Sequence, residues 1–426
     1  MRYRLTSVAV LAVLVHGPVA GQSLSERFSQ LFTFGDCGQP LCLEVNAAAH
    51  GLHYIPSVTQ GENNMLAFLT GSIATSLGSL PFAAASSGVT FRFENGIPVE
   101  TSVSGGPIFA ERSQTLGRGR VLVGANVNGI TMDNVRGMPL SDLEFRFSHQ
   151  NTQDPALGDP AFENDLIEVN TDLNLSLIVT SVFASYGLLD NVDIGVLVPI
   201  VRASLDGTSN AQVIAFPGGT STPHQFGTQA NPSLTASSAA EGSAIGIGDI
   251  AVRAKANLYQ TPEWGLAALA DARLATGDEE NFLGSGSTSF RVLGIVSGRF
   301  GNLSPHVNAG LAIRGGDNQT NSVLVTLGFD HLLSPGVSIA ADLVTDFSMG
   351  DSKLVLPEPV VYTAPTVRTV ELSDIPDEKD NLMDASFGVK FRLPGDYRAV
   401  TNILFPLADG GLRPKFLWTL GFERTF

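Results

Sequence analysis

The chain has 426 residues, of which 41 are acidic and 25 are basic, so its formal net charge is −16. An acidic chain without a cluster of Lys and Arg is a poor ligand for polyanions, which excludes nucleic acid as a partner. Its mean hydropathy is positive, +0.17, although no stretch after residue 21 resembles a membrane-spanning helix. Its apolar side chains must therefore lie in a very large core or against lipid.

Residues 1–21 have the layout of a secretory signal peptide. Arg2 and Arg4 precede an apolar run over residues 5–15, and small residues stand before Gln22. The run is too short to cross a membrane as a helix, so we expect cleavage near Gly21. Because no Cys follows the run directly, we expect no lipid anchor.

The two cysteines, Cys37 and Cys42, are close together in the segment GDCGQPLC. An oxidising compartment outside the cytoplasm would let them form a disulfide, and this pair is our disulfide candidate. Two free thiols are the alternative. We expect no metal site, because no His or further Cys stands nearby, and nothing else in the chain indicates a cofactor.

Residues 22–87 do not alternate cleanly, and we predict a partly helical plug inside a barrel. Asn63 and Asn64 are candidate caps of a helix that ends near Leu80. Apolar residues at helical spacing within it are our candidates for the plug and the substrate path: Met65, Leu66, Leu69, Ile73 and Leu77. An additional strand and a disordered arm remain alternatives for this segment.

From residue 88 to Phe426 the chain alternates polar and apolar residues many times. Between Asp165 and Phe183 the even positions are mostly polar and the odd positions mostly apolar, and GDIAVRAKANLY and MDASFGVKFRL repeat the pattern. A soluble sandwich would be complete after about seven to nine strands. We predict an all-β fold, a transmembrane antiparallel β-barrel of about 14 strands, with 12 or 16 possible, because closure leaves no unpaired edge in lipid.

The polar positions of these strands should face the interior of the barrel, the lumen. Charged residues that we assign to the lumen are Glu144, Arg146, Glu168, Asp172, Asp249, Arg253, Lys255, Asp271, Arg273, Asp342, Lys390 and Arg392. They either form a charged permeation path or pair across neighbouring strands and hold the barrel rigid. The first strand is expected near residues 88–94.

Connections alternate between tight turns, as at residues 188–191, and long links, as at residues 207–243 and 350–381. Bacterial barrels place short turns in the periplasm and long loops outside. A hydrolase is not expected, because Ser148 and His149 are adjacent on a strand and point to opposite faces. The acidic tip GDEEN lacks the spacing of a calcium loop.

Four segments resemble one family of outer-membrane proteins. They are GPIFAERSQTLGRGR (residues 106–120), YGLLDNVDIGVLVPIV (186–201), GIGDIAVRAKANL (246–258) and ATGDEENFLGSG (275–286). They are similar to the transporters labelled as the MetA pathway of phenol degradation, themselves similar to FadL-type channels. The resemblance implies a 14-stranded barrel with an N-terminal plug, uptake of hydrophobic small molecules, and a substrate exit sideways through the wall.

We therefore expect a signal peptide (1–21), a periplasmic or plug segment (22–87) and an outer-membrane barrel (88–426). The expected function is passive uptake of hydrophobic or amphipathic small molecules, such as aromatic compounds or fatty acids, without catalysis. Expected partners are outer-membrane lipid, the substrate, and the barrel-assembly machinery through the last strand ending in Phe426; we expect a monomer. A water-filled porin and a surface adhesin or structural barrel are the alternatives.

Overall fold

The computed structural model describes residues 22–35, 40–41, 43, 55–80, 91–94, 97–100, 105–148, 165–215, 224–362 and 366–426. The expected signal peptide and the pair Cys37 and Cys42 lie outside these residues, so both stay predictions. Among the helices that are described, none is both long and apolar enough to cross a membrane.

The elements follow one another along the chain with most strands in the second half of the sequence. They are α1 (Leu24–Gln30), α2 (Ile55–Ser79), β1 (Phe91–Glu94), β2 (Ile97–Glu100), β3 (Val121–Val135), β4 (Met138–Pro139), the 3₁₀ turn η2 (Leu140–Asp142), β5 (Leu143–Ser148), β6 (Leu166–Leu189), β7 (Val192–Ile214), β8 (Phe226–Thr228), β9 (Asn231–Ser233), β10 (Thr235–Ile247), β11 (Ala251–Gln260), β12 (Trp264–Arg273), β13 (Ser289–Gly298), β14 (Leu303–Arg314), β15 (Asn321–Ser334), β16 (Val337–Met349), β17 (Val360–Tyr362), β18 (Arg368–Val370), β19 (Leu382–Leu393), β20 (Tyr397–Pro406) and β21 (Leu412–Thr425).

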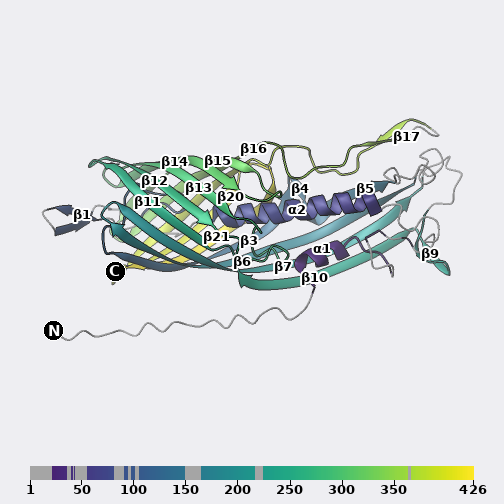
Figure 1. The fold of residues 1–426 in the computed structure, drawn as a ribbon, viewed down its shortest axis with the longest axis horizontal. Coiled ribbons are helices and arrows are strands. Elements are labelled where there is room, and N and C mark those ends of the chain that lie inside the picture. The colour runs from purple at the N-terminus through teal and green to yellow at the C-terminus, as the bar shows by residue number, and fades with distance from the viewer. Residues whose placement is uncertain are drawn as a thin grey trace.

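Twelve of the described strands close into an antiparallel barrel (Figure 1). The order around the wall is β7, β11 to β16, β19, β20, β21, β3 and β6, and β6 pairs with β7 to complete the ring. This confirms the predicted closed barrel, at the lower end of the predicted range of strand number. The first wall strand is β3, not a strand near residues 88–94, because β1 pairs only with β2 in a separate hairpin. Alternation alone does not distinguish such a hairpin from a wall strand.

Strands β6 and β7 are long, and their polarity inverts part way along. Near the short-turn end their outward positions are apolar, as at Val182, which is 53% exposed, and Ile178. Beyond Ile178 the same face of β6 is polar, as at Asp172, while the inward face becomes apolar, as at Leu175 and Val169. The outward face of the other wall strands carries exposed apolar residues as well, which is the surface that a lipid bilayer requires.

The inverted halves of β6 and β7 form an extension that stands outside the bilayer. β6 has 24 residues, so it spans about 80 Å, far more than the apolar band of about 25 Å that such barrels present to lipid. β10 pairs with the far half of β7 and β5 with the far half of β6. The short turns lie at the opposite end, beside the C-terminus in Figure 1, so the extension is on the outer side.

Helices α1 and α2 contribute to one apolar cluster with the inner face of this extension. Ser23 caps α1 reciprocally with Glu26, whose backbone N–H donates to the Ser23 hydroxyl at 3.2 Å. α2 begins at Ile55, so the prediction that Asn63 and Asn64 cap it was wrong. Pro56 stands in its first turn, where a missing N–H costs nothing.

Candidate functional site

A segment without regular structure, residues 105–120, crosses the lumen near the short-turn end. Its backbone N–H groups donate to inward-facing side chains of the wall. Gly105 N–H donates to Ser338 at 2.8 Å, Ser113 N–H to Ser297 at 3.1 Å, and Leu116 N–H to the Asp193 carboxylate at 3.0 Å. The wall thus supplies the partners that a strand neighbour would otherwise provide. We call residues 105–120 the crossing segment.

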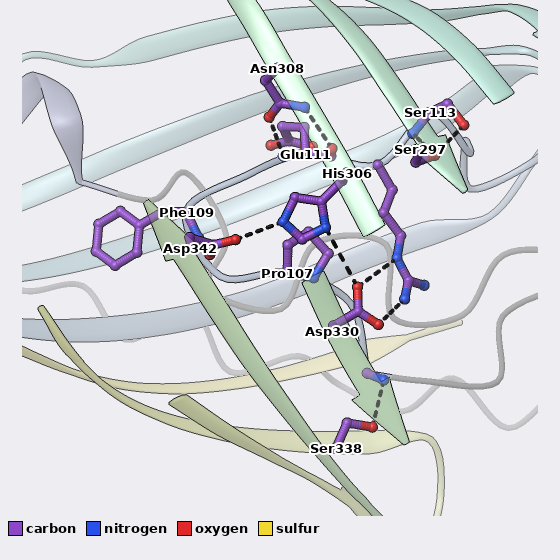
Figure 2. A network of polar contacts seen from close by, with 12 residues as sticks. Pro107, Phe109, Glu111, Ser113, Ser297, His306, Asn308, Asp330, Ser338 and Asp342 are labelled. Carbon is purple, nitrogen blue, oxygen red and sulfur yellow. Dashed lines mark hydrogen bonds and ion pairs between the residues drawn. The ribbon is translucent and has the colours of Figure 1, made fainter. Parts of the chain in front are cut away.

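Asn308 on β14 binds the backbone of the crossing segment at two points. The N–H of Glu111 donates to Asn308 Oδ1 at 2.6 Å, and Asn308 Nδ2 donates to the carbonyl of Glu111 at 3.0 Å (Figure 2). Lys390 on β19 donates to the carbonyl of Gly105, at 3.3 Å, and to that of Pro107. The segment is therefore fastened along its length, not merely packed into the lumen.

Buried charged side chains on β14, β15 and β16 hold the same segment. Arg112 forms a salt bridge with Asp330 on β15, whose Oδ1 lies 3.2 Å from Arg112 Nε. His306 lies between two carboxylates, with Nε2 at 2.6 Å from Asp342 Oδ1 and Nδ1 at 3.9 Å from Asp330 Oδ1 (Figure 2). Asp342 also accepts from the N–H of Phe109 at 3.2 Å. Removing one member would leave a buried charge uncompensated, which is costly.

A second group of charges surrounds Glu111. Its carboxylate lies 2.7 Å from Arg253 and 3.6 Å from Lys255, both on β11. Arg253 lies 3.8 Å from Asp271, which Arg291 binds at 2.8 Å. Burial acts to raise the pKa of the Glu111 carboxyl, but Arg253 and Lys255 outweigh it, and the pKa lies below its ordinary value. Glu111 is therefore ionised and ties the segment to the wall by charge.

Glycines of the wall make room where the crossing segment passes. A Cβ added at Gly388 on β19 would overlap Ile108 Cδ1, and one added at Gly265 on β12 would overlap the Ser113 hydroxyl. At both positions only glycine leaves space for the side chain of the segment. The wall and the segment are fitted to one another.

Two cavities border the C-terminal end of α2, and the second of them also borders the crossing segment. The first has apolar walls from α2 and from β6 and β7, as at Leu77 and Val179. The second is bordered by Phe109 of the crossing segment and by β12 to β16. Both are bordered by Arg273 and Arg314, so they share one polar side.

The five apolar residues predicted for the plug and substrate path lie on α2. Met65, Leu69 and Ile73 are buried in the apolar cluster, and Leu66 and Leu77 pack against it. Of the five, Leu77 borders the first cavity. Their part in a substrate path stays a prediction. Gly71 on the same helix meets the carbonyl of Asn318 so closely that a Cβ there would overlap it, which fixes α2 against the β14–β15 loop.

The charges predicted to line the lumen divide into three sets. The inward-facing residues are Arg253, Lys255, Asp271, Arg273, Asp342 and Lys390. Asp249 lies between β10 and β11 and accepts from the backbone N–H of Gly277 at 3.0 Å, and Arg392 is exposed near the short turns.

The third set, Glu144, Arg146, Glu168 and Asp172, lies on the outward face of the extension, so its assignment to the lumen was wrong. Arg146 lies 3.4 Å from Glu168 and 3.0 Å from Asp374 on that surface. The inward partners on β5 and β6 are apolar, as at Phe145 and Val169. The cause is the inversion of polarity along β6: outside the bilayer, polar residues face water and not the lumen.

Sequence reasoning did not place the crossing segment in the lumen. Its residues stand in the first family motif, GPIFAERSQTLGRGR, but they carry neither strand nor helix periodicity. The one feature that could have indicated it is the lack of alternation in a polar run that stands directly before the first wall strand. Within the described part of the chain, no group of three or more His, Cys, Asp and Glu residues is placed to hold a metal ion.

Residues 168–338 match the family described as "Putative MetA-pathway of phenol degradation", which confirms the resemblance over that part of the chain. No curated protein matches the chain. With the closed barrel and its apolar outer band, this makes the protein a bacterial outer-membrane β-barrel.

Solved structures similar to this chain include an outer membrane channel, a FadL homologue and a monoaromatic hydrocarbon channel. The channel from Pseudomonas putida F1 has 12% identity and a TM-score of 0.43, covering 73% of this chain and 97% of its own. A FadL homologue of Pseudomonas aeruginosa has 11% identity and a TM-score of 0.34, with 74% and 91% covered. A deletion mutant of the TodX monoaromatic hydrocarbon channel has 11% identity and a TM-score of 0.32, with 74% and 90% covered.

Proposed function

We propose that this protein is a channel for the passive uptake of hydrophobic or amphipathic small molecules across the outer membrane. The observation that carries the proposal is the crossing segment, which is fastened across the lumen by buried charges and by backbone hydrogen bonds. A water-filled porin needs an open lumen, so that alternative is not favoured. No observation favours the adhesin alternative.

The apolar inner face of the extension supports the same proposal. The inner face of the extension is apolar where it meets α1 and α2, and it continues to the first cavity, where Leu77, Leu80 and Val179 form an apolar side. An apolar solute that leaves water gains roughly 25 cal/mol per Å² of surface buried on such walls. The solute then leaves by movement of the crossing segment or, as the resemblance implies, sideways through the wall.

The other parts of the proposal concern partners and chemistry. We propose a monomer that is inserted by the barrel-assembly machinery through β21, and a transport process without a catalytic step. The titratable wall residues beside the crossing segment are engaged with it: Asp342 accepts from the N–H of Phe109, and Asp330 pairs with Arg112. Their role is to hold that segment.

The test measures permeation of two solutes into liposomes that contain the purified full-length protein. We expect naphthalene, followed by its partitioning into an entrapped apolar acceptor, to equilibrate faster than in protein-free liposomes, and arabinose to enter at the protein-free rate. Arabinose entry with a steady conductance in planar bilayers would instead establish the porin. Naphthalene entry at the protein-free rate would refute the uptake proposal.

A further inference from the structure

Arg202 is the only lysine or arginine in four neighbouring strands, β3, β6, β7 and β10. It lies on the outward face of β7, and its side chain is exposed. The next carboxylate on this face of β7 is that of Asp206, about 13 Å further along the strand. Among the described residues, no carboxylate or other hydrogen-bond acceptor is paired with the guanidinium of Arg202.

The strand register places Arg202 at the outer boundary of the apolar band. Its cross-strand neighbours are Ile178 on β6 and Ile245 on β10, whose side chains are 42% and 67% exposed. In the same row, Ile178 is opposite Gly129 on β3, and Gly129 is opposite Trp418 on β21, whose ring covers it. Because Trp favours the boundary between lipid and water, this row marks that boundary. We call it the boundary row.

The next row outward consists of hydroxyl side chains on the same four strands. It is formed by Thr131, Ser176, Ser204 and Ser243. Within the described part of the chain, none of these hydroxyls has a hydrogen-bond partner. We call this the hydroxyl row. The face thus changes from apolar side chains to hydroxyls in one step, with Arg202 at the step.

The third row is acidic. It is formed by Asn174, Asp206 and Glu241. Asp206 and Glu241 are direct cross-strand neighbours of like charge, so this row repels an anion. An anionic group that approaches the face is therefore directed to the boundary row, where Arg202 is the one cation.

A phosphorylated glycolipid has its groups in the matching order. Its phosphate and sugar lie directly above its acyl chains, so the phosphate meets the boundary row and the sugar meets the hydroxyl row. The planar guanidinium of Arg binds a phosphate through two hydrogen bonds. Ser and Thr hydroxyls both donate to and accept from sugar hydroxyls, and carboxylates accept from them. A phospholipid offers the phosphate and the chains but no phosphorylated sugar for the hydroxyl row.

We infer that the outward face of β3, β6, β7 and β10 binds the headgroup of a phosphorylated glycolipid of the outer leaflet, of the lipopolysaccharide class, and that Arg202 binds its phosphate. The acyl chains lie against Ile178 and Ile245. Because the chain has a net charge of −16, its surface as a whole repels anionic lipid, and binding depends on this local arrangement. The site holds a structural lipid and not the transported solute, so it does not depend on the proposed function.

The test measures lipid binding to the full-length protein in micelles of an uncharged detergent, by native mass spectrometry. The lipids are lipid A with two phosphates, the same lipid after removal of both phosphates, and phosphatidylglycerol. The variants are Arg202→Gln, Arg202→Lys, the double variant Ser204→Ala with Ser243→Ala, and the control Arg392→Gln. Arg392 is an exposed cation near the short turns, at the opposite end of the barrel. Each variant must first show the heat-dependent gel mobility of a folded barrel.

We expect the native protein to bind lipid A at least about tenfold more tightly than its dephosphorylated form, from the worth of hydrogen bonds to charged groups. Arg202→Gln should bind the two forms within about twofold of each other, and Arg202→Lys should recover part of the preference. The double serine variant should keep the preference for phosphate but lose the preference for lipid A over phosphatidylglycerol. Arg392→Gln should behave as the native protein.

Three results would overturn the inference. Equal binding of the two forms of lipid A by the native protein, or an undiminished preference in Arg202→Gln, would show that Arg202 does not bind the phosphate. An equal loss in Arg392→Gln would show a general effect of charge. If phosphatidylglycerol binds as tightly as lipid A, Arg202 only reaches from the lipid edge to any anionic headgroup, and the assignment to a glycolipid is wrong.

Discussion

Replacement of Asn308 by Leu should release the crossing segment and open the channel. Leu has the same branched skeleton of four side-chain heavy atoms as Asn but no polar group, so the change removes both hydrogen bonds to the backbone of Glu111, of 2.6 Å and 3.0 Å. Each buried group left without its partner costs about 1–3 kcal/mol, so with two such groups the docked segment should lose roughly 2–6 kcal/mol. The ratio of open to closed molecules should rise by a factor of roughly 30 to 20,000.

The assay is single-channel recording in planar bilayers at fixed salt. We expect rare, brief openings for the native protein and frequent or long openings for Asn308→Leu. The matched control is Asn128→Leu, because Asn128 is also a buried amide of the lumen but bonds to Thr419 and Asn126 and not to the crossing segment. It should leave the openings unchanged.

A reversible cross-link tests whether movement of the segment is the cause. The hydroxyls of Ser113 and Ser297 lie 2.6 Å apart, so cysteines at these positions are placed to form a disulfide. In a background without Cys37 and Cys42, the oxidised pair should suppress the openings of Asn308→Leu, and a reductant should restore them. Openings that persist under oxidising conditions, or that appear equally in Asn128→Leu, would refute the reasoning.

Three further predictions concern the wall. Val182→Arg should cost about 2–4 kcal/mol of barrel stability near the middle of the bilayer, measured by unfolding in lipid vesicles, whereas Asp172→Arg on the same strand should have little effect; equal losses would contradict the polarity inversion. Gly388→Val should push Ile108 away and increase openings in planar bilayers, and native-like traces would show that the fit at Gly388 is loose. Arg146→Gln, on the outward face, should change stability by less than about 1 kcal/mol and leave conductance as in the native protein, and an altered conductance would place Arg146 on the permeation path.

The sequence by itself determined the barrel. A strand between lipid and water needs apolar residues on one face and polar residues on the other. Side chains alternate between the two faces, so this need appears as an alternation of apolar and polar residues within a single strand. For this reason the alternation of the strands that carry Arg253, Asp271 and Lys390 predicts that their charges face the lumen.

Alternation does not state which face is wet. Along β6 the same even positions face water at Asp172 and lipid at Val182, and only the height of the residue relative to the bilayer distinguishes the two. Height depends on where the neighbouring strands end, which is a property of the assembled wall. Glu144, Arg146 and Glu168 were misplaced for this reason.

The tertiary structure alone decided what closes the lumen. The crossing segment forms its hydrogen bonds with side chains such as Asn308 and Ser297, which lie almost 200 residues further along the chain. The sequence of the segment has neither strand nor helix periodicity, so no local pattern indicates partners at that distance.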